Sequence, residues 1–303
     1  MNGQHIGRFA PSPTGPLHYG SLLAALASFL NIRSQNGRWL VRMEDIDPPR
    51  EVAGAADDIL RTLESFHLHW DDEVMYQSAR MDAYEEALQS VISHQLAYPC
   101  TCTRKELRER GETTYQGHCR NGVDPDRPQH SIRIRSTSDD IGFADLIQGD
   151  LHYKLRSHAG DFIIRRADGL FAYQLAVVVD DAAQKITEVI RGADLLESTA
   201  HQLYLQQVLG YASPLYGHIP IALNEEGVKL SKQTGAQPIS KQPAVPVLIR
   251  ALQDLGQQVP DELQSANIEE VLQWAIENWS LNHVPLVISD TVQKPRSTNP
   301  SAS

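Results

Sequence analysis

The sequence predicts an α/β protein with a parallel sheet that binds a nucleotide, and three stretches carry this prediction. An apolar strand end around Ile6 and Phe9 leads into a loop rich in proline and glycine, and leucines at helical spacing follow. Two further strand-like runs lie at 38–43 and 186–190. Ligands bind beyond the carboxyl ends of strands in an open parallel sheet, so we expect the functional residues there.

The composition indicates a soluble protein of about two domains. The chain has 303 residues, of which 41% are apolar. It contains no apolar run long enough to span a bilayer, and its first residues lack a signal-peptide pattern. Three cysteines, all between positions 100 and 119, argue against a disulfide framework. We therefore expect a cytoplasmic monomer with no membrane partner.

The formal charge of −11 does not favour an RNA partner, but net charge does not locate the charges. Residues 100–135 hold eight basic and five acidic side chains, a local excess of three positive charges. A solvated helix face explains this excess as well as RNA binding does. The basic residues are Arg104, Lys105, Arg108, Arg110, Arg120, Arg127, Arg133 and Arg135.

The loop after the first strand has the features of an anion site. Its prolines restrict the backbone, and Gly20 leaves room for a flat ligand. The first amides of the following helix lack intrahelical partners, and His18 can donate to a phosphate there. By itself the pattern favours an ordinary turn with a surface histidine, because neither a Walker lysine nor a Gly-x-Gly-x-x-Gly turn is present.

A second basic loop, Lys229-Leu-Ser-Lys232, follows the apolar run 219–223. Two lysines three residues apart suit the charge that develops when the α-phosphate of a nucleotide is attacked. Alone, such a loop is typical of solvated surface. Together with the first loop it predicts a site for the phosphates of a nucleotide.

The segment Pro-Ser-Pro-Thr-Gly-Pro-Leu-His-Tyr-Gly at 11–20 and the Lys-Leu-Ser-Lys loop resemble the two signatures of class I aminoacyl-tRNA synthetases, in their glutamyl form. Ser21 departs from the signature, which commonly has a second histidine there. The resemblance implies a Rossmann-type parallel sheet, an inserted zinc-containing α+β domain like an acceptor-binding domain, and a small C-terminal helical region. The implied boundaries are two nucleotide-binding halves at 1–97 and 170–236, an insertion at 98–169, a helical cap at 237–287 and a disordered tail at 288–303.

The resemblance also implies site residues, with His18 and Lys232 as the catalytic pair and Mg²⁺ arriving with ATP. The implied ATP-binding residues are Pro11, His18, Gly20, Ser21, Lys229, Ser231 and Lys232. The implied glutamate-binding residues are Arg8, Phe9, Ala10, Pro11, Ser12, Glu44, Tyr173 and Arg191.

Acidic residues follow the second strand, where Glu44 begins a cluster that ends at Asp47 and Pro48. A carboxylate in this place can hold an ammonium group such as the α-amine of an amino acid. We expect Asp47 to cap a helix that the prolines open. The resemblance assigns the amine to Glu44.

Tyr173 and Arg191 flank the third strand-like run. Tyr173 starts an apolar segment and can present its hydroxyl to a pocket, and Arg191 lies where it can bind a carboxylate in bidentate fashion. Spacing alone allows a surface pair of Arg191 with Asp194 equally well. The resemblance favours the ligand role, and Arg8 with Arg191 would match the two carboxylates of glutamate.

Cys100, Cys102 and Cys119 offer three thiolates, one ligand short of a tetrahedral zinc site. Chemistry alone favours His118 as the fourth ligand over Tyr115 or water, whereas the resemblance implies Tyr115. We therefore expect one structural zinc. Short strand-like pieces predict a small mixed sheet in the same region, at 131–135, 143–147, 151–154 and 162–166.

The resemblance implies an ATP-dependent ligase that activates L-glutamate as an adenylate. The chain stops after the small helical cap, as in a truncated paralogue of the glutamyl enzymes, which implies transfer of glutamate to the queuosine base in the anticodon of tRNA(Asp). Three alternatives stay open: a core enzyme that charges tRNA(Glu), a nucleotidyltransferase of the same superfamily, and a catalytically silent module that binds RNA or zinc.

Overall fold

A computed structural model describes residues 4–127, 130–136, 140–158, 160–222 and 239–287. The lysine loop and the predicted disordered tail lie outside these residues. In the part that is described, no helix is long and apolar enough to cross a membrane.

The main sheet has seven strands in the order β3-β2-β1-β9-β10-β6-β7. Neighbours are parallel from β3 to β6, and β7 closes the edge as the antiparallel partner of β6. The Rossmann-type α/β sheet predicted from the sequence is therefore confirmed. Its strands are β1 (Ile6–Phe9), β2 (Arg38–Met43), β3 (Met75–Tyr76), β6 (Ile141–Asp145), β7 (Gly149–Tyr153), β9 (Glu188–Gly192) and β10 (Leu215–Ile219).

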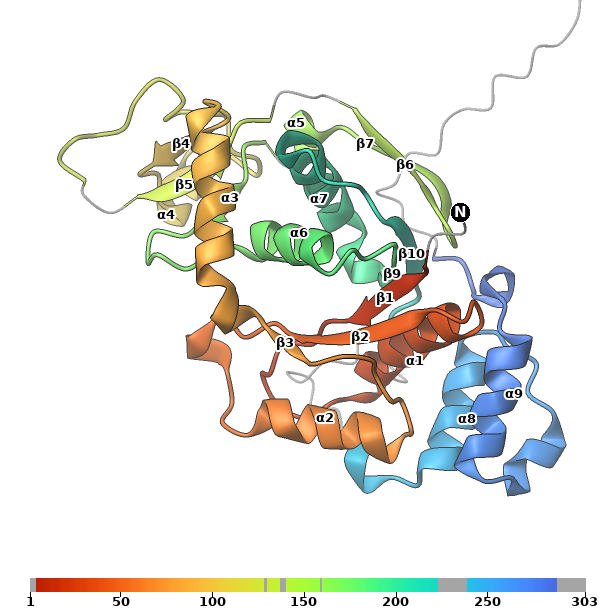
Figure 1. Cartoon of the computed structure of the whole chain (residues 1–303). Helices are drawn as coiled ribbons and strands as arrows, with labels where there is room; N and C mark the ends of the chain where they lie inside the picture. Colours follow the sequence, from red (N-terminus) through yellow and green to blue (C-terminus); the bar gives the residue numbers. More distant parts are fainter. Residues whose placement is uncertain (1–3, 128–129, 137–139, 159, 223–238, 288–303) are drawn as a thin grey trace, which may run out of the picture.

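Helices cover both faces of this sheet (Figure 1). On one face lie α1 (Tyr19–Arg33) and α2 (Ala55–Ser65), with α8 (Ala244–Asp254) and α9 (Ile268–Asn278) packed against α1 in one core. The other face packs against α6 (Tyr173–Ala183) and α7 (Leu196–Leu209). Short 3₁₀ turns lie at Pro48–Arg50, Gln77–Arg80, Ala193–Leu195, Ile239–Lys241, Asp261–Ser265 and Leu281–His283.

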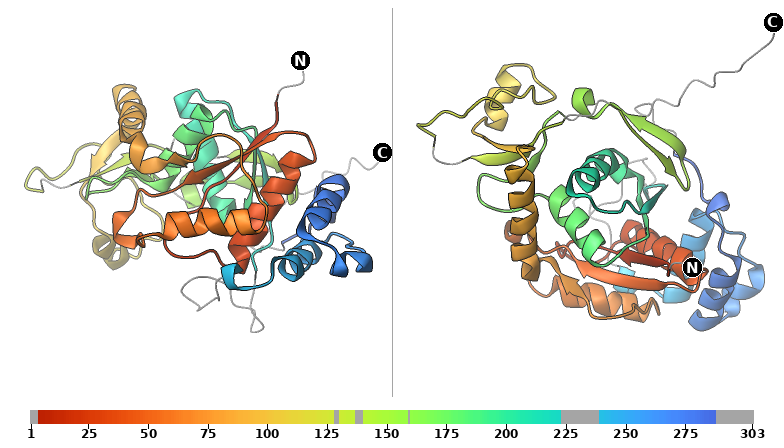
Figure 2. Two further views of the ribbon diagram at one scale, coloured as in Figure 1. Left: turned by 60° about the horizontal axis from the view of Figure 1, so that its bottom comes forward. Right: turned by 45° about the horizontal axis from the view of Figure 1, so that its top comes forward.

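A second sheet of three antiparallel strands, β4-β5-β8, lies at the far end of α3 (Met81–Ser93), as Figure 2 shows. Its strands are β4 (Ala97–Cys100), β5 (Ser131–Ile134) and β8 (Ile163–Arg165), and α4 (Arg104–Glu109) and α5 (Leu155–His158) complete this region.

The predicted small mixed sheet is wrong in its membership. Only two of the four predicted pieces, β5 and β8, join the second sheet, and that sheet is antiparallel. The other two form the β6–β7 hairpin, which turns at Gly149 with φ of +79° and extends the main sheet through β10. Short strand patterns predict strands but do not identify their partners, and here the partner lies 71 residues along the chain from Asp145, at Tyr216.

One face of the main sheet carries apolar side chains toward the amino ends of its strands and polar side chains toward their carboxyl ends. Register pairs Arg8 with Leu40 and Arg191 with His218, and residues two apart along a strand share a face. Toward the amino ends this face is apolar, with Ile6, Leu40, Val189 and Tyr216 in one cluster. Toward the carboxyl ends it carries the buried polar side chains of Arg8, Arg42, Arg191 and His218. The fold thus concentrates charge beneath α6, at the strand ends where a ligand is expected.

Candidate amino-acid and nucleotide site

Arg8 and Arg42 are both bound by one carboxylate, Asp181 of α6. Arg8 Nε donates to Asp181 Oδ1 at 3.0 Å, and an Arg42 terminal nitrogen donates to the same oxygen at 2.7 Å. All three side chains are buried. The two guanidinium groups therefore share one hydrogen-bonded carboxylate, and Glu44 and Asp180 are further negative charges near Arg42.

Glu44 follows β2 and completes this charged group. Its backbone N–H donates to the carbonyl of Pro11 at 2.9 Å, which ties the end of β2 to the first loop. Burial raises the pKa of its carboxyl to about 7, although Arg42 and Arg8 act to lower it. Among the described residues none donates a hydrogen bond to this carboxylate. It is therefore available to an ammonium group.

Arg191 is buried, with 5% of its surface exposed, so the alternative of a surface pair with Asp194 does not apply. Its Nε donates to His218 Nε2 at 3.1 Å, and one terminal nitrogen donates to Thr199 Oγ1 at 2.7 Å. The other terminal nitrogen lies 3.4 Å from the Tyr173 hydroxyl. Within the described chain no carboxylate is within ion-pair distance of Arg191. A buried cation without an acidic partner is costly, so this end of the guanidinium suits a ligand carboxylate.

The capping role expected for Asp47 is wrong. Asp47 precedes the 3₁₀ turn Pro48–Arg50, but its side chain makes no capping hydrogen bond. Instead the carboxylate accepts from Arg50 Nε at 2.5 Å and lies 3.3 Å from an Arg166 nitrogen. The two charged partners outcompete the weaker bond to a backbone amide.

His18 is the N-cap of α1, and its Nδ1 accepts from the Ser21 amide at 3.2 Å. Gly20 lies against the His18 ring and Ala222, because a Cβ at position 20 would lie 3.3 Å from the ring and 3.5 Å from Ala222. The absence of a side chain at Gly20 therefore leaves room for the His18 ring and for Ala222, as well as for a ligand. The amides of Tyr19 and Gly20 have no acceptor in the described part of the chain, and an anion can use them.

Both ends of the segment 223–238 lie at the first loop. Ala222, before this segment, lies beside Gly20, and Ile239, after it, donates its backbone N–H to the Leu17 carbonyl at 3.2 Å. Lys229, Ser231 and Lys232 themselves lie outside the described residues. A hollow of about 330 Å³ near this place is lined by Tyr19, Leu23, Pro220, Ile221, Ala222, Arg250, Asp254 and Leu255.

The three cysteines come together in the second region. The sulfur atoms of Cys100, Cys102 and Cys119 lie within 4.8 Å of one another. The Tyr115 hydroxyl lies 3.3 Å from Cys100 Sγ and accepts from the Cys119 amide at 2.8 Å. His118 turns toward Glu112, with Nε2 2.7 Å from Oε1. The geometry therefore brings Tyr115, and not His118, to the sulfur cluster, and the three cysteine sulfurs are donors that suit zinc.

The electrostatics of the cluster favour a thiolate at one position. Although burial opposes ionisation, the hydrogen bond from Tyr115 and a backbone amide lower the pKa of Cys119 to about 7. Burial and the neighbouring Cys119 raise the pKa of Cys102 to about 11. Arg133 Nε donates to Cys100 Sγ at 3.3 Å and supplies a positive charge beside the cluster.

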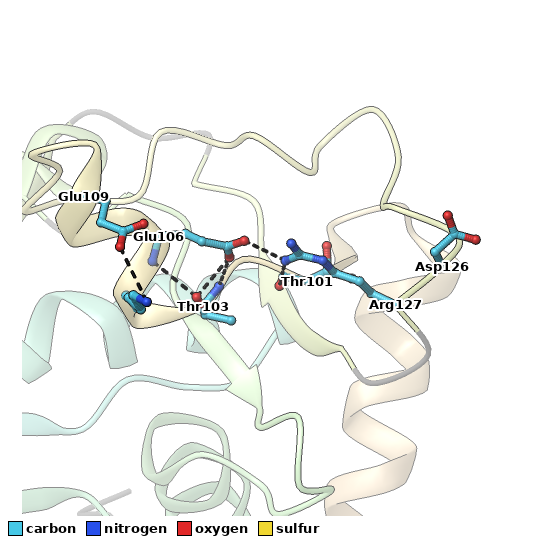
Figure 3. Close-up of a pocket in the computed structure, with 7 residues that line it drawn as sticks. Thr101, Thr103, Glu106, Glu109, Asp126 and Arg127 are labelled. Carbon is cyan, nitrogen blue, oxygen red and sulfur yellow. Dashed lines mark hydrogen bonds and ion pairs between the residues drawn. The ribbon is translucent and has the colours of Figure 1, made fainter.

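Three of the eight basic residues of 100–135 have partners inside the protein. Arg120 binds the buried Asp161 through two nitrogens, at 2.7 and 2.6 Å. Arg133 is buried beneath the Tyr115 ring, and Arg135 donates to the Arg120 carbonyl. Arg127 pairs with Glu106 across a surface hollow of about 620 Å³ (Figure 3). These four arginines therefore stabilise this region, while Arg104, Lys105, Arg108 and Arg110 lie exposed on and beside α4.

The sequence did not indicate Asp181, Arg42, His218, Thr199 or Asp145 as site residues. Arg42 and His218 each interrupt the apolar alternation of a central strand at an inward position, which is a signal of a buried functional side chain. Asp181 ends the apolar run of α6 and carries no comparable signal.

Comparison with known proteins gives the class. The family of class I tRNA synthetases (E and Q), catalytic domain, matches residues 6–274. The glutamate tRNA ligase from Elizabethkingia meningosepticum, solved in complex with its amino acid, superposes with a TM-score of 0.79 at 26% identity. That alignment covers 93% of this chain and 66% of that one. The glutamate-tRNA synthetase from Elizabethkingia anophelis gives the same TM-score at 25% identity. The fold is that of a class I tRNA synthetase catalytic domain.

Curated relatives narrow this class. The glutamyl-Q tRNA(Asp) synthetase of Dechloromonas aromatica is 51% identical over 292 residues, which is 94% of this chain and 97% of the relative. That of Escherichia coli K12 is 52% identical over 93% of this chain and 91% of the relative. The chain belongs to the glutamyl-Q tRNA(Asp) synthetase family. The resemblance inferred from the two motifs is thereby confirmed.

Proposed function

We propose that the protein activates L-glutamate with ATP as glutamyl-adenylate and transfers the glutamyl group to the queuosine base in the anticodon of tRNA(Asp). The observation that carries the glutamate site is the buried Arg191, which has no acidic partner among the described residues. The acceptor comes from the names of relatives that are about half identical over nearly the whole chain.

Glutamate would lie at the carboxyl ends of β1, β2 and β9. Arg191 with Tyr173 would bind one carboxylate and Arg8 the other, while the Glu44 carboxylate would hold the amine. The charges support this arrangement. Arg191 has no acidic partner among the described residues and can bind a carboxylate, and the Glu44 carboxylate can bind the amine. The first loop, through Phe9, Ala10, Pro11 and Ser12, would complete the pocket.

ATP would bind at the amino end of α1. A carboxylate is a poor acyl donor, so its oxygen attacks the α-phosphate, a mixed anhydride with AMP forms, and pyrophosphate leaves. His18, Gly20, Ser21 and the lysine loop would stabilise the charge on the phosphates, with Lys232 as the main cation. Two contacts support the lysine loop's place near the ATP phosphates. Ala222, just before the segment 223–238, lies beside Gly20, and Ile239, just after it, donates its N–H to the Leu17 carbonyl. Mg²⁺ bound with ATP would neutralise part of the phosphate charge.

The cysteine cluster with Tyr115 would hold one structural zinc ion. We propose 98–169 as the inserted domain, apart from the hairpin that joins the main sheet, with the nucleotide-binding halves at 1–97 and 170–236 and the helical cap at 237–287. The zinc would stabilise the connection between β4 and β5. Cys100 at the end of β4 would supply one ligand, and Cys102, Tyr115 and Cys119 in the connection would supply the other three.

A transfer assay tests the proposal. Radiolabelled glutamate and ATP are incubated with tRNA(Asp) that contains or lacks queuosine, and with tRNA(Glu). Acid-labile label on queuosine-containing tRNA(Asp) alone supports the proposal. Label on tRNA(Glu) instead would identify a glutamyl-tRNA synthetase core. Pyrophosphate exchange without glutamate would identify a nucleotidyltransferase, and no exchange with any tRNA would indicate a silent module.

A further inference from the structure

Asp145 and His218 are two buried polar residues whose roles the proposed glutamate site does not explain. Asp145 ends β6 and is 5% exposed, and His218 lies fully buried in the neighbouring strand β10. Buried carboxylates and imidazoles destabilise a protein unless their polar atoms are hydrogen-bonded. Hydrogen bonds connect Asp145 through His218 to Arg191 and to Thr199.

Asp145 fixes the proton of His218. Its Oδ1 accepts backbone N–H groups from Ile147 at 3.0 Å, from Gln148 at 2.8 Å and from His218 at 3.2 Å. Its Oδ2 lies 2.5 Å from His218 Nδ1. An ionised carboxylate only accepts hydrogen bonds, so the proton of the imidazole lies on Nδ1.

His218 in turn accepts a hydrogen bond from Arg191. The guanidinium only donates, and Arg191 Nε lies 3.1 Å from His218 Nε2, so Nε2 must keep its lone pair. The two residues are register partners in the parallel strands β9 and β10, which holds them side by side. One terminal nitrogen of Arg191 donates to Thr199 Oγ1 and lies 3.4 Å from the Leu195 carbonyl, and the other, near the Tyr173 hydroxyl, is left for a ligand.

We propose that Asp145 and His218 are positioning residues, in which the carboxylate selects the Nδ1–H tautomer and the Nε2 lone pair orients Arg191 toward the ligand carboxylate. This inference rests on the proposed glutamate site. The two residues touch neither substrate nor nucleotide in this account. They set the plane of the guanidinium. The other tautomer would turn an Nε2–H toward Arg191 Nε, so that Arg191 loses its acceptor and Thr199 Oγ1, 3.1 Å from Nε2, becomes the acceptor for the imidazole.

Asp145→Asn tests the tautomer directly. The three backbone N–H groups that donate to Asp145 Oδ1 should donate to the side-chain oxygen of the asparagine. Its NH₂ group then faces His218 Nδ1 and donates to it. The imidazole proton then moves to Nε2 and opposes Arg191 Nε. In glutamate-dependent ATP–pyrophosphate exchange, we expect the KM for glutamate to rise about tenfold or more, with the KM for ATP and kcat within about twofold of wild type.

Variants at position 218 separate positioning from a structural role. His218→Gln offers an acceptor to Arg191 and should keep the KM for glutamate nearer to wild type, whereas His218→Leu offers none and should raise it. Once Leu replaces the imidazole there is no tautomer to select. The double variant Asp145→Asn/His218→Leu should therefore have the same KM for glutamate as His218→Leu alone. Additive increases in KM, or equal effects of Gln and Leu, would overturn the proposal.

Histidine ¹⁵N NMR supplies a readout that does not depend on activity. Wild type should show His218 protonated at Nδ1, and Asp145→Asn should show it protonated at Nε2. An Nε2–H signal in wild type would overturn the inference, as would an unchanged KM for glutamate in a folded Asp145→Asn variant. If wild type shows the Nδ1–H tautomer but no glutamate-dependent exchange, the proposed function fails while the Asp145–His218 geometry stands, and the role for a ligand carboxylate is refuted with it. Should Asp145→Asn not fold, the comparison of His218→Gln with His218→Leu decides.

Discussion

Arg8 of the first strand donates twice to Asp181 of α6, through Nε at 3.0 Å and through a terminal nitrogen at 3.4 Å, although 173 residues separate them in sequence. Both side chains are about 4% exposed. The arginine that would bind substrate is thus held in place before any ligand arrives. Sites of this kind lose little side-chain entropy on binding.

Asp181→Asn should lower both stability and glutamate binding. It removes the one negative charge that is hydrogen-bonded to both Arg8 and Arg42, and breaking a buried ion pair typically costs about 3 kcal/mol. The melting temperature should fall by roughly 5–10 °C, as measured by calorimetry.

Asp180→Asn is the matched control for this variant. Asp180 is equally buried but binds Gln77, Arg80 and Tyr84, and not Arg8. Both variants should lose stability, yet below both melting temperatures only Asp181→Asn should raise the KM for glutamate. Equal KM values in the two variants would contradict the role given to Asp181.

Arg191→Ala should abolish glutamate activation while the fold persists. It removes the buried cation proposed to bind a carboxylate, and a loss of about 100-fold or more in kcat/KM for glutamate is expected. Arg191→Lys should also be impaired, because an ammonium group cannot bind His218, Thr199 and a carboxylate in one plane. Exchange kinetics with circular dichroism as the fold control provide the check, and normal kinetics in Arg191→Ala would refute the placement of the substrate.

Glutamate binding should weaken as the pH falls through about 7. Burial raises the pKa of Glu44 to about 7, so below that pH the free protein carries a neutral carboxyl that cannot pair with an ammonium group. The KM for glutamate should rise by up to about tenfold per pH unit below 7, while the KM for ATP serves as the control. A flat profile between pH 6 and 8.5 would contradict the role of Glu44.

The same residue should limit stability above neutral pH. Since the pKa of Glu44 is raised on folding, its favourable contribution is complete below about 4.5 and is lost as the pH rises to about 7. Glu44→Gln removes this penalty and should melt at a higher temperature than wild type at pH 8, though not at pH 4, while losing glutamate binding. A lower melting temperature at pH 8 would show that the ionised carboxylate stabilises the free protein.

Zinc content should depend on Tyr115 and the cysteines but not on His118. Cys102→Ser should purify with little zinc by mass spectrometry and melt at a lower temperature, because the metal joins β4 to the loop that follows α4. His118→Ala is the control, since His118 binds Glu112. Loss of zinc in His118→Ala together with full occupancy in Tyr115→Phe would reverse the assignment of the fourth ligand.

Local patterns were sufficient to predict much of the fold. The first strand, the helix after the first loop and the second strand follow from apolar spacing and from turn residues. The helix ends at Arg33, and the turn that follows contains Asn36 with φ of +54°. The strand that leads to Arg191 was predicted for the same reason. These elements depend on residues close in sequence, where spacing carries the information.

Partners distant in sequence could not be predicted in this way. Nothing near Arg8 identifies Asp181, and nothing near β6 indicates that its hairpin joins β10. Arg120 and Arg133 were counted as surface charge because their buried partners, Asp161 and Cys100, lie far along the chain. Sequence patterns identified residues suited to the chemistry, and only the fold shows which side chains already have a partner.

The most direct test of the account is pyrophosphate exchange into ATP by the purified wild-type protein, measured with and without L-glutamate. If glutamate binds at the carboxyl ends of β1, β2 and β9 and ATP binds at the first loop, exchange should depend on glutamate. Glutamine, which lacks the second carboxylate, should not support it. Exchange that proceeds equally without an amino acid, or that glutamine supports as well as glutamate, would contradict it.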